Sequence, residues 1–76
     1  MDRIAQCRAA ARNQRLWASQ ALVDARYNYA QAKRDRTLGN YTLARSHQHE
    51  GDVDMYWYHR RLRWAKDYTQ CRPPKR

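Results

Sequence analysis

The residues with the clearest chemical potential lie near the end of the chain, in residues 52–72, where arginines alternate with aromatic side chains. Arginine pairs with phosphate or carboxylate groups, and tyrosine or tryptophan rings stack on unpaired bases. The candidate contacts to an anion in this stretch are Arg60, Arg61, Arg63, Lys66 and Tyr56. We predict that Arg60, Arg61 and Arg63 form the principal contact.

Arg61 differs from its neighbours because it falls in the middle of the apolar side of the expected helix, between Trp57 and Trp64. Two interpretations are open. The stem of Arg61 packs on aromatic rings while its head pairs with an acid such as Asp24, or the residue faces a binding partner. The first is preferred. We expect Trp57 and Trp64 to fill the core rather than to stack on bases.

A second set of basic residues lies in the first half of the chain, in a rough row on one side of an expected helix. The members of this row are Arg8, Arg12, Arg15, Arg26 and Lys33. A row of this kind can follow the phosphates of a nucleic acid, although a run of charges is more often a solvated helix face.

The sequence contains no pattern that indicates an enzyme or a cofactor site. We find no nucleophile paired with a base, no carboxylate pair at a useful spacing and no glycine-rich phosphate loop. His47 and His49 point to different sides of a helix. The two cysteines are expected at the other end of the folded chain, so these ligands do not converge on a metal. We therefore expect no catalysis, no metal and no cofactor.

The charge of the chain points to an anionic partner. Its 76 residues carry 16 Lys and Arg against 7 Asp and Glu, a formal net charge of +9 that is spread over both halves. Such a protein attracts polyanions, of which nucleic acid is the leading candidate and an acidic protein surface the next. The longest uncharged runs are far too short to span a membrane.

The first half of the chain predicts one long helix over residues 2–37, because no Pro or Gly interrupts it and Asp2 suits its N-cap. One face of this helix has the spacing of a core stripe: Ile4, Cys7, Ala11, Ala18, Ala21, Leu22, Ala25, Tyr29 and Ala32. Most of the stripe is alanine, so we expect the partner helix to supply the large side chains. A second, weaker apolar strip is formed by Leu16, Val23, Tyr27 and Ala30.

The second half predicts a return that is broken into two helices. Gly39 suits the left-handed position after a helix end, and Asn40 suits the next N-cap. We expect a short helix over 40–49, a break or kink at Gly51, and a long helix over 52–71. Pro73 and Pro74 end that helix before a short basic tail.

These elements predict an all-α fold, an antiparallel helical hairpin with a long first helix and a broken return helix. Residues 1–72 form a single helical domain, and residues 73–76 form the tail. Two helices bury too little surface to be stable in so short a chain, so we expect a homodimer that forms a four-helix bundle.

The two cysteines, Cys7 and Cys71, come close together at the open end of such a hairpin. A disulfide there would join the two ends of the chain. No secretory signal pattern begins the sequence, so we expect a cytoplasmic protein and, with it, two reduced thiols rather than a disulfide.

The properties together predict a small, basic, non-enzymatic protein that binds nucleic acid through backbone charge, of the type carried as an accessory by phages, plasmids or bacteria. The alternative is an adaptor or inhibitor that docks on an acidic surface of a larger host protein. A third possibility is a minor structural component of a particle. We expect no membrane partner and no small-molecule substrate.

Overall fold

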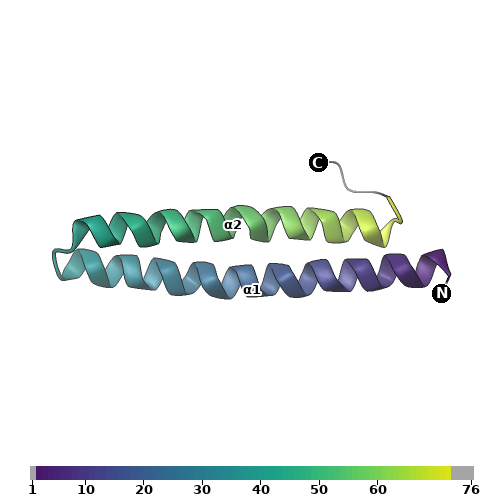
Figure 1. Ribbon diagram of the computed structural model, residues 1–76, viewed down its shortest axis with the longest axis horizontal. Helices are drawn as coiled ribbons and strands as arrows, with labels where there is room; N and C mark the ends of the chain where they lie inside the picture. Colours follow the sequence, from purple (N-terminus) through teal and green to yellow (C-terminus); the bar gives the residue numbers. More distant parts are fainter. Residues whose placement is uncertain (1, 73–76) are drawn as a thin grey trace.

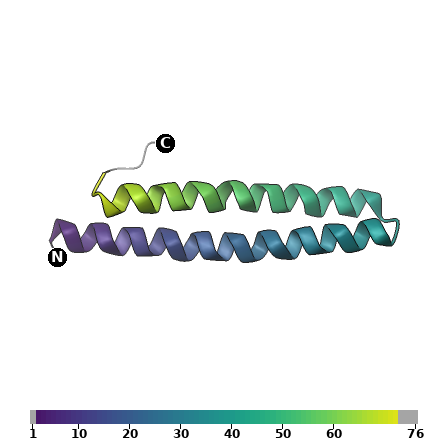
Figure 2. The same cartoon turned by 180° about the vertical axis from the view of Figure 1, so that it is seen from behind.

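The computed structural model describes residues 2–72 and shows two antiparallel helices that pack side by side (Figure 1). Helix α1 comprises Arg3–Thr37 and α2 comprises Tyr41–Thr69, and the hairpin extends over 55 × 19 × 13 Å. The opposite view shows that no further described segment covers the pair (Figure 2). The predicted all-helical hairpin is confirmed, and the described residues contain no strand.

The limits of α1 follow from local signals that the sequence displays. The backbone N–H of Ala5 donates a 2.7 Å hydrogen bond to the Asp2 carboxylate, which satisfies one of the unpaired donors of the first turn. At the other end Gly39 adopts a φ of +80°, the left-handed conformation that glycine accepts without strain. Asn40 occupies the N-cap position of α2, but its side chain makes no capping hydrogen bond.

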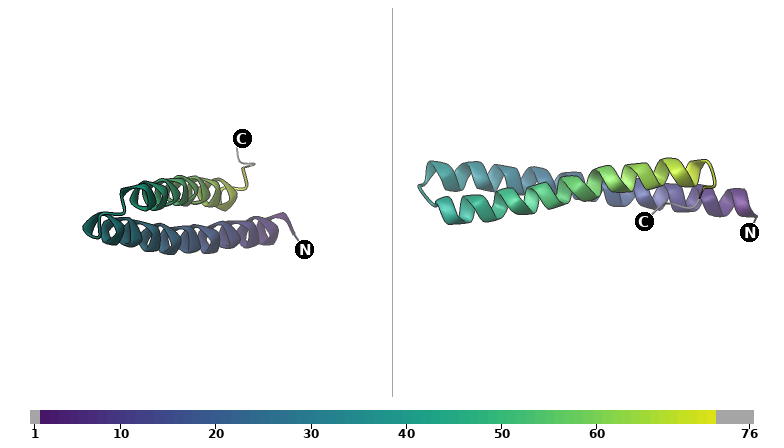
Figure 3. Two further views of the ribbon diagram at one scale, coloured as in Figure 1. Left: turned by 60° about the vertical axis from the view of Figure 1, so that its left-hand side comes forward. Right: turned by 90° about the horizontal axis from the view of Figure 1, so that it is seen from above.

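The interface between the helices is built from the smallest side chains. Ala11, Ala18, Ala25 and Ala32 are buried and follow one another at intervals of seven residues along α1. Their counterparts on α2 are Ala44, Gly51 and Ala65, which are also separated by multiples of seven. A seven-residue repeat keeps one stripe in contact when two helices wind slightly around each other, and Figure 3 shows the helices crossing at a shallow angle.

The expectation that large side chains oppose the alanine stripe is wrong. The buried apolar side chains are all alanines, and the buried polar ones are Gln14 and Asp35. On α2 the stripe position between Gly51 and Ala65 holds Tyr58, which is half-buried, and Trp64 is half-buried as well. Trp57 lies instead at the edge of the interface with 41% of its surface exposed.

The second apolar strip of α1 lies on the surface. Leu16, Val23 and Tyr27 have exposed fractions of 62%, 58% and 62%, and Ala30 is also exposed. This strip faces away from α2, so the hairpin itself does not use it.

The predicted break at Gly51 is wrong, since α2 is continuous from Tyr41 to Thr69. Gly51 is buried in the middle of the helix, and a Cβ placed there would lie 2.7 Å from the ring of Tyr29. The glycine thus makes room for a tyrosine of α1 and does not end a helix. Its cost in helix propensity is about 1 kcal/mol, which a long packed helix tolerates.

We predict that Gly51→Ala destabilises the hairpin, although alanine is the better helix former. The added methyl overpacks the Tyr29 ring at a cost of about 1–3 kcal/mol, which exceeds the gain in helix propensity. In a Tyr29→Ala background the same change has room and becomes stabilising. Urea denaturation followed by circular dichroism checks this for the unmodified chain, the two single variants and the double variant. A stabilising effect of Gly51→Ala in the unmodified chain would contradict the prediction.

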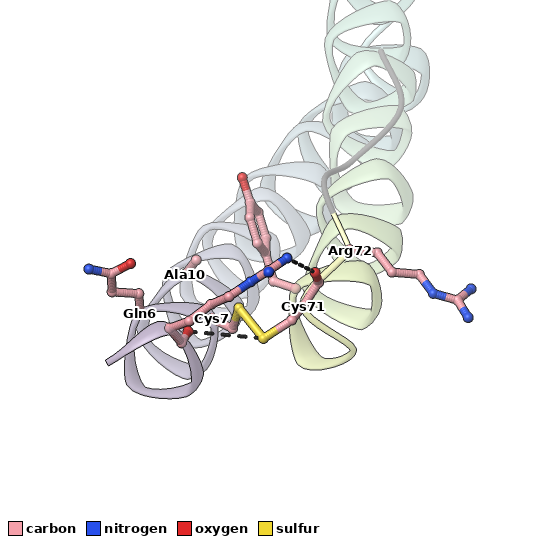
Figure 4. A pocket seen from close by; sticks show the side chains of 7 residues that line it. Gln6, Cys7, Ala10, Cys71 and Arg72 are labelled. Atoms are coloured by element: carbon pink, nitrogen blue, oxygen red, sulfur yellow. Dashed lines mark hydrogen bonds between the residues drawn. A yellow bond between two sulfur atoms is a disulfide. The ribbon is translucent and has the colours of Figure 1, made fainter. Parts of the chain in front are cut away.

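The open end of the hairpin is closed by a disulfide between Cys7 and Cys71 (Figure 4). The two Cα atoms are 5.4 Å apart, and the cysteines are 64 positions apart in the chain. Cys71 follows the end of α2 in a left-handed conformation with a φ of 52°, and its N–H donates to the Tyr68 carbonyl. The expectation of two reduced thiols is therefore wrong in this structure.

We predict that reducing this disulfide lowers the free energy of unfolding by about 4 kcal/mol, because the bond restricts a long loop in the unfolded chain. Thermal unfolding with and without a thiol reductant measures the effect. A Cys7→Ala/Cys71→Ala variant serves as the control, since its stability cannot respond to the reductant. Equal stability of the oxidised and reduced chain would show that the bond contributes nothing.

Candidate nucleic-acid interface

Polar pairs across the helix interface fix how α1 and α2 are aligned. Near the turn, a ring nitrogen of His47 lies 2.7 Å from the Asp35 carboxylate. Further along, the side-chain amide of Asn28 donates a 2.9 Å hydrogen bond to Asp54. Alanine contacts alone specify alignment weakly, so these partly buried pairs supply the specificity.

The bond between Tyr29 and Asp52 shows which edges of the helices meet on one side. The Tyr29 hydroxyl donates a 2.7 Å hydrogen bond to the Asp52 carboxylate. This bond, partial burial and the negative charges of Asp52 and Asp54 raise the pKa of Tyr29 above its ordinary value of 10.0. The hydroxyl therefore stays protonated, and keeps its hydrogen bond, at neutral pH.

The three tryptophans gather on the other side, around the head of Arg61. The guanidinium carbon lies 4.9 Å from the ring centre of Trp17, 5.5 Å from that of Trp57 and 5.3 Å from that of Trp64. Attraction between the cation and the faces of the rings holds this cluster together. We call the surface formed by Trp17, Trp57 and Trp64, with Arg61 between them, the tryptophan side.

Arg61 contacts aromatic rings as expected, but it does so through its guanidinium head, which was expected to pair with Asp24. The expected pairing with Asp24 is wrong. Arg61 donates a 3.2 Å hydrogen bond to the side-chain oxygen of Gln14, which is buried at the interface. Asp24 instead accepts a 2.9 Å hydrogen bond from Gln20 on its own helix. A neutral amide thus receives Arg61, so the cluster keeps its positive charge.

Most of the other candidate cations lie opposite the tryptophan side. Arg15 is two residues from Trp17, and Lys66 is two residues from Trp64, which turns each pair about 200° apart around its helix. Arg8, Arg12, Arg26 and Lys33 continue from Arg15 at helical spacing, and all are exposed. We call the following set the basic side: Arg8, Arg12, Arg15, Arg26, Lys33 and Lys66.

The remaining candidates form a crest along the outer surface of α2. Arg60 donates a 3.0 Å hydrogen bond to the Tyr56 hydroxyl and lies over the rings of Tyr56 and Trp64. Tyr56, His59, Arg60 and Arg63 line a shallow depression there. The structure thus brings Arg60 and Arg63 together but places Arg61 in the tryptophan cluster and Lys66 on the basic side.

The cations of the described residues have no carboxylate partners. Within residues 2–72 no Arg or Lys lies within 4.0 Å of a carboxylate oxygen, and the recorded ion pair joins Asp35 to His47. Several carboxylates are occupied by neutral donors, such as Tyr29 at Asp52 and Asn28 at Asp54. The positive charge is therefore not neutralised locally, and its field extends into the solvent.

Sequence reasoning missed Trp17 and Gln14, the two residues of α1 that receive Arg61. The pattern that identifies Gln14 is the seven-residue repeat, since it lies three residues after Ala11 and seven after Cys7. Trp17 has no comparable signal, because its role depends on the alignment of the two helices.

No protein-family model, no curated protein and no solved structure matches the chain. Neither described helix contains a segment with the length and hydropathy needed to cross a membrane. Residues 2–72 also contain no group of three or more His, Cys, Asp or Glu arranged to hold a metal ion.

We predict that Arg61→Ala lowers the free energy of unfolding by about 1–3 kcal/mol, because it leaves three indole rings without their cation and Gln14 without its donor. Arg63→Ala is the matched control, since Arg63 is exposed and its removal should change stability by less than about 0.5 kcal/mol. Urea titration followed by tryptophan fluorescence measures both. If Arg61→Ala left the free energy of unfolding unchanged, the result would instead indicate that Arg61 serves to contact a partner.

Proposed function

We propose that the chain is a small, basic, non-enzymatic protein that binds nucleic acid through its phosphate backbone, using the basic side. The observation that carries the proposal is the row of exposed cations on α1 and Lys66 on α2, none of which has a carboxylate within 4.0 Å among the described residues. Binding of phosphates to such cations releases counterions, and this favours association without base recognition.

The dimensions of the basic side suit a duplex. From Arg8 to Lys33 the row extends about 37 Å along α1, which is about one turn of double helix. A straight rod of this kind can lie along the phosphates over that length. The Arg60 and Arg63 crest is a second, smaller candidate surface, and binding experiments decide between them.

We further propose that the protein works as a cytoplasmic homodimer in which two hairpins form a four-helix bundle. Its support is the core, in which no apolar side chain larger than alanine is buried among residues 2–72. Apolar burial of this size contributes little, so a second copy would supply stability that one hairpin lacks. In a reducing cytoplasm the Cys7–Cys71 bond would be open to exchange.

The second candidate is an adaptor that docks the same basic surface on an acidic protein. The observation in its favour is that Tyr27, Tyr41 and Tyr56 are all more than half exposed, because tyrosine and arginine dominate protein interfaces. Affinity purification from nuclease-treated lysate separates the two functions. A defined protein that stays bound favours the adaptor, and loss of all bound material favours nucleic acid.

We predict that Arg12→Gln/Arg26→Gln weakens binding to a fluorescently labelled duplex. The slope of log affinity against log salt, which is negative, should become shallower by about 2. Both residues are exposed on the basic side, and each removed phosphate contact contributes about 1 to that slope. Fluorescence anisotropy over a series of salt concentrations provides the measurement.

The matched control is Arg60→Gln/Arg63→Gln, which removes the same charge from the crest. We expect it to reduce affinity less than the basic-side pair. Equal losses would show that only net charge matters, and a larger loss in the crest pair would move the interface to α2. Unchanged binding by both variants, or no binding by the unmodified chain, would rule out the proposed function.

A further inference from the structure

The hairpin exposes more surface than a compact protein of its size. Its accessible area is 6097 Å², whereas a compact monomer of this mass exposes about 4,900 Å². The excess of roughly 1,200 Å² is larger than the ~800 Å² that each partner buries in a standard protein interface. Covering one side of the hairpin with a second copy would therefore remove about two thirds of this excess.

Charge decides which side a second copy can cover, because each copy carries a formal net charge of +9. The basic side would place arginines against arginines. The strip with Leu16 and Val23 is bordered by Arg12 and Arg26, which lie four residues before Leu16 and three after Val23. Like charges would thus surround an interface at either place.

The tryptophan side carries charges of both signs. A recess on it is lined by Trp17, Trp57 and Arg61 together with the carboxylates of Asp24 and Asp54. Glu50 lies seven residues before Trp57, on the same edge of α2. Positive and negative groups are therefore both present, as a two-fold interface requires when a surface must complement itself.

This side also offers the apolar area that association needs. Trp17 is 53% exposed and Trp57 is 41% exposed, and edge-on packing of Trp57 with Tyr56 extends the aromatic surface. Leu43 lies on the same edge of α2, two seven-residue repeats before Trp57, and is also exposed. Tryptophan, tyrosine and arginine are the residues that contribute most to interface affinity.

We infer that the tryptophan side is the surface on which a second copy of this chain packs, through Trp17, Trp57 and Trp64. The two-fold dimer buries the aromatic cluster at its centre and leaves the basic side of each copy facing outward. The inference rests on the proposed homodimer and not on what the basic side binds. Its test is therefore independent of the test for nucleic-acid binding.

The test is sedimentation equilibrium of the oxidised, nuclease-treated chain, combined with acrylamide quenching of tryptophan fluorescence. All three tryptophans lie on the proposed interface, so quenching reports its burial directly. We expect a dimer at micromolar concentrations, and we expect quenching to weaken as the concentration rises through the dissociation constant. A monomer throughout this range, or a dimer with unchanged quenching, would overturn the inference.

The matched variants are Trp17→Gln and Leu16→Gln, which alter neighbouring exposed residues on different sides of α1. We expect Trp17→Gln to raise the dissociation constant at least roughly tenfold, as loss of a central aromatic contact does. Leu16→Gln should leave it unchanged, with circular dichroism confirming equal helix content. The reverse order would place the second copy on the Leu16 strip. Arg12→Gln/Arg26→Gln should still dimerise, which separates this test from that of the basic side.

Discussion

The close approach of two helices through alanine and glycine is the constraint on which the rest of the structure depends. Ala11, Ala18, Ala25 and Ala32 recur every seven residues, and Gly51 continues the pattern on the opposing helix. Small residues bring the backbones together but bury little apolar area, and Gly51 leaves space for the one ring of Tyr29 that packs on it. Large side chains such as Trp17 and Trp57 therefore lie at the flanks, where they form a surface instead of a core.

Because the large side chains lie at the flanks, the hairpin has two unlike sides. Trp57 and Trp64 reach around the edge of α2 and meet Trp17 over the head of Arg61. Arg15 and Lys66, each two residues from a tryptophan, are turned to the far side. A conventional core of leucines would have hidden its aromatic residues. In this chain the packing constraint makes them available to a partner while it separates them from the basic row.

The long first helix, the turn at Gly39 and the antiparallel pairing were predictable because each depends on local signals that nothing opposes. Gly51 shows where such signals fail, since the same residue suits a helix end and a close contact, and only the Tyr29 ring of the other helix decides between them. The prediction of a hydrogen-bond partner for Arg61 was wrong for a related reason. A carboxylate was the obvious choice for a cation, but the alignment of the helices presents the amide of Gln14.

The charge that favours a polyanionic partner also opposes folding. A formal net charge of +9 on a thin rod, without local ion pairs from Arg or Lys in residues 2–72, repels itself in the folded state. The Cys7–Cys71 bond offsets part of this cost by restricting the unfolded chain at the end farthest from the turn. A ligand that binds only the folded chain stabilises it by mass action. Under the proposed function, nucleic acid is such a ligand, because its phosphates neutralise the charges that destabilise the free hairpin.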